Sequence, residues 1–156
     1  MQIVGIILIL VSGVGAAWVL LQGQKRELES AEAVLELLLY VKTAVDTYSM
    51  TASEMLRSCN SDIVRKMGYS GEEPPSSFLQ LLEASEISDG TVRDIFSDFA
   101  RSFGKNYRRR QSEDCSLAIE RLRVRVSELE KALPVRRRMI VSICISVSLI
   151  LVILLL

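Results

Sequence analysis

The amino-acid sequence predicts an all-α protein in which a helical-bundle domain lies between an N-terminal and a C-terminal transmembrane helix. All 19 basic and all 19 acidic residues of the 156-residue chain fall within residues 23–138, which leaves residues 1–22 and 139–156 without charge. Within residues 23–138 the apolar residues recur mostly at three- and four-residue steps, as they do on one face of a helix. No stretch alternates as a half-buried strand would.

The first element is the apolar segment of residues 1–22. At about 1.5 Å per residue such a helix spans roughly 30 Å, the thickness of the hydrocarbon core of a bilayer. A cleaved signal peptide is the alternative, but it carries basic residues before its apolar run. Here Lys25 and Arg26 come after the run, and Trp18 fits the aromatic belt at a membrane interface. An uncleaved anchor is therefore favoured.

The last element, residues 139–156, has no charged residue and is predicted to be a second, slightly short transmembrane helix. Arginines at positions 136–138 precede it, and no basic residue lies beyond either span on its outer side. By the positive-inside rule, residues 23–138 are expected in the cytoplasm and both termini outside. The sequence thus predicts a membrane hairpin with a cytosolic head.

The head is expected to begin with an amphipathic helix over residues 27–56, which can continue from the first span. A break near residues 47–51 is left open, because hydroxyl and β-branched residues cluster there. Residues 60–62, which read Asn-Ser-Asp, are expected to cap a short helix at residues 63–67 that Gly68 ends. Residues 70–76, which contain Gly-Glu-Glu-Pro-Pro, are expected to form a loop.

The following helices carry the expected aromatic core. Ser76 is predicted to cap a helix over residues 78–86, and Ser88 or Asp89 to open the next one, which Gly104 ends or bends. Their phenylalanines are expected to form the centre of the core, which we favour over a binding groove. These phenylalanines are Phe78, Phe96, Phe99 and Phe103.

Residues 110–133 show the longest regular apolar pattern, a seam with three- and four-residue steps. With barely three heptads, one helix of a bundle is favoured over a true coiled coil. Pro134 is expected to end this helix.

Residues that carry out catalysis are scarce. The chain has no histidine, which excludes Ser-His-Asp and Cys-His catalysis and histidine-containing metal sites. Cys59, Cys115 and Cys144 form neither a metal-binding spacing nor a disulfide framework. Phosphate loops and nucleophile elbows are missing, and Glu72 and Glu73 in the loop are weak acid–base candidates. The sequence therefore predicts a protein that is not an enzyme and that has no cofactor or metal.

Charge is divided along the head. Residues 72–98 hold seven acidic residues and one basic residue, whereas residues 101–110 hold five basic residues and no acid. Solvated faces that pair with each other would explain this. The functional alternatives are anionic lipid headgroups for the basic turn and a basic protein partner for the acidic stretch, with no nucleic acid expected. Candidate interface residues are Arg101, Lys105, Arg108, Arg109, Arg110, Glu83, Asp94 and Asp98.

Residues 99–111, which read FARSFGKNYRRRQ, and the helix LAIERLRVRVSELEKAL with the apolar tail resemble the stage III sporulation protein AB family. The family signature is an aromatic residue, Leu-Gly, an Asp two residues on and a Gln four further on. Phe99, Gly104 and Gln111 match it, whereas Phe103 replaces the Leu and Tyr107 replaces the Asp. The Thr-Pro of the family's first cytosolic helix and the glycines of its second span are absent.

The family is similar to inner-membrane platform proteins of type II secretion and type IV pilus machines. The resemblance implies a non-enzymatic platform subunit of a channel complex between mother cell and forespore, in the mother-cell membrane that faces the forespore. Its implied partners are a cytosolic secretion-type ATPase and other channel subunits, and a homo-oligomer is left open. Phe99, Phe103, Gly104 and Gln111 would be structural or interface residues. A generic membrane-anchored helical scaffold or sensor that recruits soluble partners is the alternative.

Overall fold

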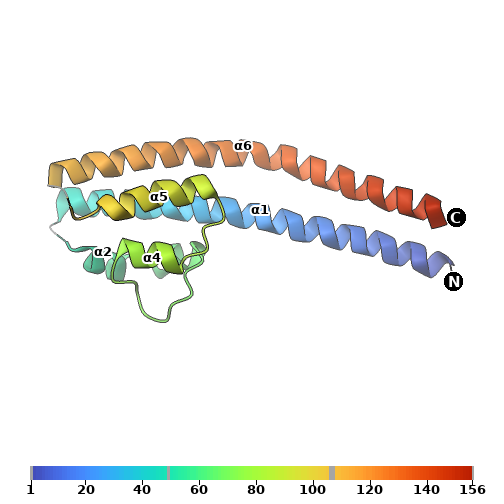
Figure 1. Ribbon diagram of the computed structural model, residues 1–156, viewed down its shortest axis with the longest axis horizontal. Coiled ribbons are helices and arrows are strands. Elements are labelled where there is room, and N and C mark those ends of the chain that lie inside the picture. The colour runs from blue at the N-terminus through green and yellow to red at the C-terminus, as the bar shows by residue number, and fades with distance from the viewer. Residues whose placement is uncertain (1, 49, 106–107, 156) are drawn as a thin grey trace. The chain divides into compact units, whose positions relative to one another are not determined.

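The computed structural model describes residues 2–48, 50–105 and 108–155, and inside the helices it leaves out the side chains of residues 2–11, 13, 14, 16, 108, 152, 154 and 155. No strand occurs among the described residues, so the predicted all-α class is confirmed (Figure 1). The helices are α1 (Gln2–Thr47), α2 (Ala52–Ser58), α3 (Ser61–Lys66), α4 (Phe78–Ala84), α5 (Gly90–Ser102) and α6 (Arg108–Leu155).

The chain divides into two compact units. The head consists of residues 27–128, and the terminal unit consists of residues 1–26 together with residues 129–156. The long helices α1 and α6 contribute to both units, whereas α2 to α5 belong to the head alone. Within the head, α1 and α6 run antiparallel, and Cys115 near the start of α6 lies close to Lys42 and Asp46 near the end of α1 (Figure 1).

The head is held together by an apolar core to which each of its helices contributes. On α1 the buried positions recur every three or four residues, and α6 presents a matching seam, as the sequence predicts for one helix of a bundle. Side chains of α2 to α5 fill the space beside them. The largest fully buried apolar side chains are Val34, Leu37, Leu38, Val41, Met55, Met67, Phe78, Leu81, Val92, Phe96 and Leu122.

Helix α1 ends at Thr47, within the region where the sequence allows a break, and α2 begins at Ala52. Thr51 is the N-cap of α2 and forms a capping box with Glu54. The Thr51 amide donates to the Glu54 carboxylate at 2.7 Å, and the Glu54 amide donates to Thr51 Oγ1 at 3.4 Å. Asn60 caps α3, and Gly68 follows it with φ of +81°, so both predicted signals around this helix are confirmed.

Two boundaries of α4 differ from the predictions by small shifts, and α3 spans residues 61–66 where 63–67 was expected. Ser77, not Ser76, caps α4, and its hydroxyl accepts from the Gln80 amide at 3.2 Å. Ser76 lies just before the cap, and its amide donates to the side-chain oxygen of Gln80 at 2.8 Å. Adjacent serines offer the same capping chemistry, so the pattern cannot choose between them. Helix α4 also ends two residues earlier than expected, at Ala84.

The prediction that Pro134 ends the last helix is wrong. Helix α6 begins at Arg108, two residues before the expected start, and passes through Pro134 to Leu155. Proline in a helix removes one hydrogen bond and leaves the carbonyl of residue 130 without its usual donor. Because Pro134 and Glu130 are both exposed, that carbonyl can be solvated. The helical segments on either side are then continuous through the proline.

Among the residues that the structure describes, we find no helix with an apolar stretch long enough to cross a membrane. Most side chains of the first predicted span, residues 1–22, and several at the end of the second, residues 139–156, lie outside the described residues.

Candidate functional site

The four phenylalanines predicted as the core centre contact one another at the junction of α4 and α5. The ring of Phe78 meets Phe99 and Phe103 edge-on, with centroids 5.4 and 4.7 Å apart, and Phe96 stacks on Phe99 at 6.2 Å. Phe78, Phe96 and Phe99 are buried, whereas Phe103 is half-buried at the end of α5. This confirms that the cluster is a core that fixes α5 on α4, and not an open groove.

Gly104 ends α5, as predicted. The amide of Phe103 still donates to the Phe99 carbonyl at 2.9 Å, and Gly104 then takes φ of +81°. A Cβ added to Gly104 would meet no atom within 4 Å. Glycine is therefore required here for its left-handed backbone and not for space, and it directs the chain into the turn toward α6.

The remaining motif positions lie on this turn or just after it. Gln111 is half-buried on the first turn of α6. Tyr107 and the side chain of Arg108 lie outside the described residues. Of the motif positions, Phe99, Phe103 and Gly104 shape the end of α5.

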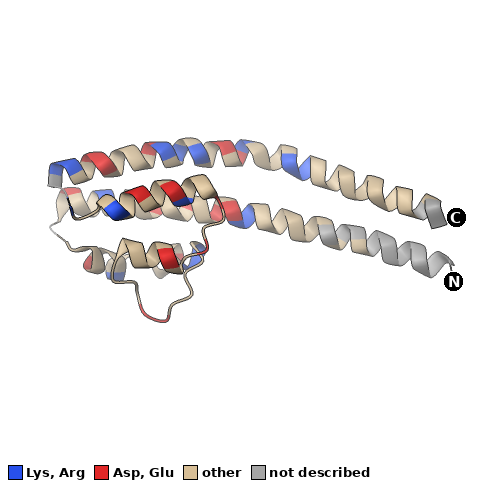
Figure 2. Ribbon diagram, viewed as in Figure 1, with Lys and Arg blue, Asp and Glu red and all other residues tan. Residues whose placement is uncertain are grey.

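The candidate charged residues on α5 form one exposed stripe. Asp94, Asp98 and Arg101 follow each other at steps of four and three residues, which places them on the same face of the helix. Figure 2 shows that α5 carries both acidic and basic residues. All three are exposed, and so are Glu83 on α4 and Lys105 in the turn after α5. Arg101 lies in the last turn of α5, where the helix dipole favours a base, whereas neither acid lies in the first turn.

The acidic stretch and the basic turn do not neutralise each other. No acid of residues 72–98 lies within ion-pair distance of a base of residues 101–110 among the side chains that the structure describes. Arg109 instead approaches Glu113 of its own helix at 3.4 Å, and Arg110 is exposed beside it. Both charged regions are therefore open to a partner, although each exposed pair contributes little to stability.

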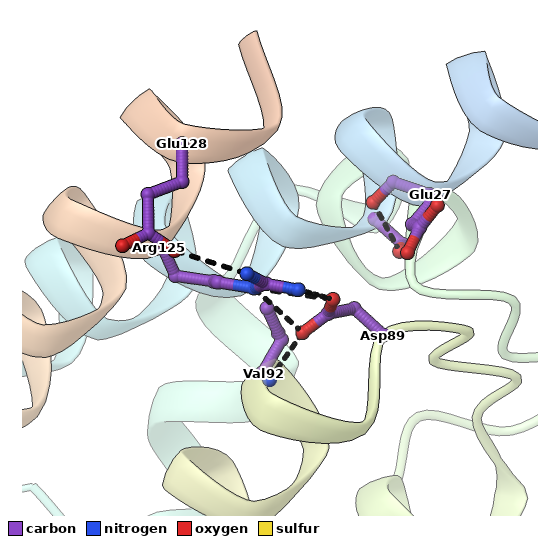
Figure 3. A network of polar contacts seen from close by, with 6 residues as sticks. Glu27, Asp89, Val92, Arg125 and Glu128 are labelled. Carbon is purple, nitrogen blue, oxygen red and sulfur yellow. Dashed lines mark hydrogen bonds and ion pairs between the residues drawn. The ribbon is translucent and has the colours of Figure 1, made fainter. Parts of the chain in front are cut away.

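The polar contact that fixes α5 against α6 joins Asp89 to Arg125 (Figure 3). Arg125 donates from Nη2 to Asp89 Oδ2 at 2.7 Å and from Nε to both carboxylate oxygens at 3.2 and 3.3 Å. Asp89 also caps α5, because its Oδ1 accepts from the Val92 amide at 2.8 Å. Arg125 Nη1 donates to Glu128 Oε2 at 3.0 Å. On α1, the Ser30 hydroxyl donates to the backbone carbonyl of Glu27 at 3.0 Å.

Electrostatics around this pair favour the charged forms. Burial raises the pKa of the Asp89 carboxyl, but the hydrogen bonds from Arg125 and from the Val92 amide outweigh it, so the pKa lies below its usual value. Hydrogen bonds to Asp89 and Glu128 raise the pKa of Arg125. The side chain of Asp89 is only 4% exposed. A buried, ionised carboxylate thus holds the start of α5 on α6.

Sequence reasoning did not identify this pair. Asp89 stands out in the sequence as a helix cap and as one acid of the acidic stretch, and Arg125 stands out in neither way. A signal was present, because Arg125 lies among the apolar seam residues Leu122, Val126 and Leu129 of α6. An arginine beside such a seam needs a partner from another helix, but the sequence does not say which acid supplies it.

A groove of about 450 Å³ lies between α2, α3 and the following loop. The loop is compact, because the Tyr69 hydroxyl donates to the Glu73 carbonyl at 2.8 Å and Gly71 passes so close to the Tyr69 ring that no Cβ would fit. Both acidic and basic side chains line the groove. This mixture does not select one class of ligand, and Glu72 and Glu73 are exposed.

The cysteines of the head are not activated. Burial raises the pKa of the Cys59 thiol, and it raises the pKa of the Cys115 thiol to about 12. Within the described part of the chain, no three Cys, Asp or Glu residues are grouped so that they could hold a metal ion.

Comparison with known proteins agrees with the resemblance in residues 99–111. Neither the curated proteins nor the solved structures give a match to the chain. A family model described as stage III sporulation protein AB matches residues 2–156, nearly the whole chain. The protein therefore belongs to the stage III sporulation protein AB family.

Proposed function

We propose that the protein is a non-enzymatic, membrane-anchored platform subunit of a secretion-like channel complex between mother cell and forespore. In this proposal the head lies in the mother-cell cytoplasm and docks a cytosolic ATPase, and both termini lie across the membrane that faces the forespore. Membership of a sporulation family supports the setting. The observation that carries the proposal is the apolar surface of the terminal unit.

That surface is extensive along α6. Between residues 139 and 153 most large apolar side chains point outward, with exposed fractions from 37% for Val141 to 69% for Ile153. Exposed apolar area costs about 25 cal/mol per Å² in water, and soluble proteins rarely leave such a surface open. A bilayer removes this cost and tolerates the helix because its backbone is fully hydrogen-bonded. These exposed residues are Met139, Val141, Ile143, Ile145, Val147, Leu149, Ile150, Leu151 and Ile153.

The head supports the docking role through its charges. The α5 stripe of Asp94, Asp98 and Arg101 changes sign along its length, and its members are exposed. A partner that carries the complementary order of charges would be oriented as well as attracted. The turn between α5 and α6 lies at the end of the head opposite Glu27 and Glu128, where the chain leaves it, about 30 Å away along α6. We therefore assign the basic turn to a protein partner in preference to lipid.

Binding to the ATPase tests this role. The purified full-length protein in detergent is titrated with the secretion-type ATPase of the same cells. The variant Asp94→Asn/Asp98→Asn is expected to weaken binding by about tenfold, because rim charges steer and orient such complexes. Glu32→Gln/Glu36→Gln is the matched control, since both acids are exposed and four residues apart on α1. Equal loss in both variants, or no ATPase binding, would contradict the docking role.

Topology is tested separately by reporters fused into the loop of residues 70–76. A reporter that is active only in the cytoplasm is expected to work there, and one that is active only outside the membrane is expected to fail. The opposite pattern would overturn the orientation. A correct topology in a protein that sporulating cells do not need would instead favour the generic scaffold.

A further inference from the structure

We infer that a cleft in the terminal unit binds an anionic phospholipid, with the phosphate held by Lys25 and Arg137. The cleft has a volume of about 660 Å³. Its walls come from Trp18, Leu21 and Lys25 on α1 and from Leu133, Pro134 and Arg137 on α6. The inference rests on the proposed membrane anchoring and adds to it a chemically specific site.

The lining combines two properties that a phospholipid has and a free ion lacks. Trp18, Leu21, Leu133 and Pro134 supply apolar walls, and each helix adds one basic side chain. Among the described residues, no acid lines the cleft. Basic pockets between helices at the cytoplasmic side of a membrane suit anionic headgroups. An acidic peptide would satisfy the cations but would leave the apolar walls to water.

Spacing along each helix places the two properties at different depths. On α1, Lys25 follows Trp18 by seven residues, two helical turns or about 10 Å. Trp18 is 64% exposed, and an indole ring prefers the headgroup level of a bilayer. Lys25 lies on the side of Trp18 that leads into the head. The order from apolar wall to cation along α1 therefore matches the order from acyl chain to phosphate.

A second groove continues the site along α6. It has a volume of about 740 Å³, shares Pro134 and Arg137 with the cleft, and extends along Val141 and Ile145. Arg137 therefore lines both grooves, and the second groove has apolar side chains where the acyl chains would lie. This arrangement favours a membrane lipid over soluble phosphate as the occupant.

Trp18 is the single tryptophan of the chain, so its fluorescence reports directly on the cleft. The full-length protein is reconstituted in phosphatidylcholine vesicles that contain a small fraction of phosphatidylglycerol or phosphatidylcholine with brominated acyl chains. Bromine quenches tryptophan on contact. We expect brominated phosphatidylglycerol to quench Trp18 at a much lower fraction than brominated phosphatidylcholine, by about 25-fold if each of the two cations contributes about fivefold. Glycerol phosphate in excess should not relieve the quenching.

Matched double variants assign the preference to the cleft. Lys25→Gln/Arg137→Gln is expected to abolish most of the preference for phosphatidylglycerol. Arg137→Gln alone is expected to lower the preference about fivefold, and this single variant leaves the other contacts of Lys25 intact. Lys131→Gln/Arg136→Gln removes one lysine and one arginine that line neither groove, and it is expected to change the preference by less than about threefold. Equal loss in both double variants would overturn the site in favour of general surface attraction.

Flotation of the same vesicles separates failure of the site from failure of the anchor. Protein that does not float with the vesicles contradicts the proposed membrane function itself. Protein that floats but is quenched equally by both lipids, or is released from quenching by glycerol phosphate, contradicts only the phospholipid site. Protein that floats with Trp18 shielded from both lipids would mean that another protein surface, such as a second copy, fills the cleft.

Discussion

Replacing Asp89 with Asn removes the charge that joins α5 to α6 but keeps a side chain that caps helices well. In the folded protein Asp89 is 4% exposed and meets Arg125, which is 28% exposed, at 2.7 Å. Breaking a buried pair from one side costs about 3–5 kcal/mol. Arg125 is partly solvated and keeps its contact with Glu128 at 3.0 Å. We therefore expect Asp89→Asn to lower the free energy of unfolding by less than this, by about 2 kcal/mol, which is typical of a hydrogen bond to a charged group.

The measurement is urea unfolding of the full-length protein in detergent, followed by circular dichroism. The expected result for Asp89→Asn is a lower midpoint with an unchanged slope. Glu128→Gln removes the exposed partner of the same arginine and should cost less than about 0.5 kcal/mol. A cycle with Arg125→Gln should give a coupling energy of about 1–2 kcal/mol. Equal effects of Asp89→Asn and Glu128→Gln would refute the reasoning, since burial would then not matter.

The same pair predicts how stability depends on pH. The pKa of Asp89 is lower in the folded protein than its ordinary value, so the unfolded chain takes up the proton first as pH falls. The contribution of the pair is therefore complete above about pH 4 and is lost as pH falls through the folded pKa. Unfolding midpoints measured from pH 6 down to pH 3 should fall more steeply for the wild-type protein than for Asp89→Asn. Parallel curves would show that Asp89 does not gain its charge stabilisation on folding.

Three further substitutions and one chemical modification test the packing of the head. Gly104→Ala should cost about 1–2 kcal/mol in urea unfolding, because its φ is +81° and only the backbone opposes a side chain. Gly68→Ala should cost more, since its added Cβ would lie 2.9 Å from the Glu86 amide nitrogen; the reverse order would contradict this reading. Phe99→Ala should cost about 3–5 kcal/mol, and a loss under 1 kcal/mol would show that the aromatic cluster is loosely packed. Iodoacetamide at pH 8 should modify Cys115 only after unfolding, because burial raises the pKa of its thiol to about 12, and rapid labelling of the folded protein would contradict that burial.

How far the sequence determines the fold differs from element to element. The cap of α3 and the glycine turn at Gly104 were predicted correctly, and Asp89 is one of the two caps expected for α5, because each depends on local backbone chemistry that a few residues decide. The passage of α6 through Pro134 was not, because it depends on solvation of a carbonyl and on the strength of the flanking helices. Local rules see the proline but not its surroundings.

The candidate site shows the same division. Exposure of Asp94, Asp98 and Arg101 follows from helical periodicity, which places them opposite the buried face of α5. The contact between Asp89 and Arg125 joins residues 36 positions apart, and several acids could have paired with that arginine from sequence alone. The cleft beside Trp18 likewise needs two segments from opposite ends of the chain. Long-range pairing of this kind is set by packing, which no local pattern encodes.

The central claim is that the protein serves a membrane complex in sporulating cells, and a deletion strain complemented by a fluorescent fusion tests it most directly. The account predicts that deletion arrests sporulation at stage III. It also predicts that the fusion restores spores and gathers in the mother-cell membrane around the forespore. Normal spore yield in the deletion strain, or a rescuing fusion spread through the cytoplasm, would contradict it.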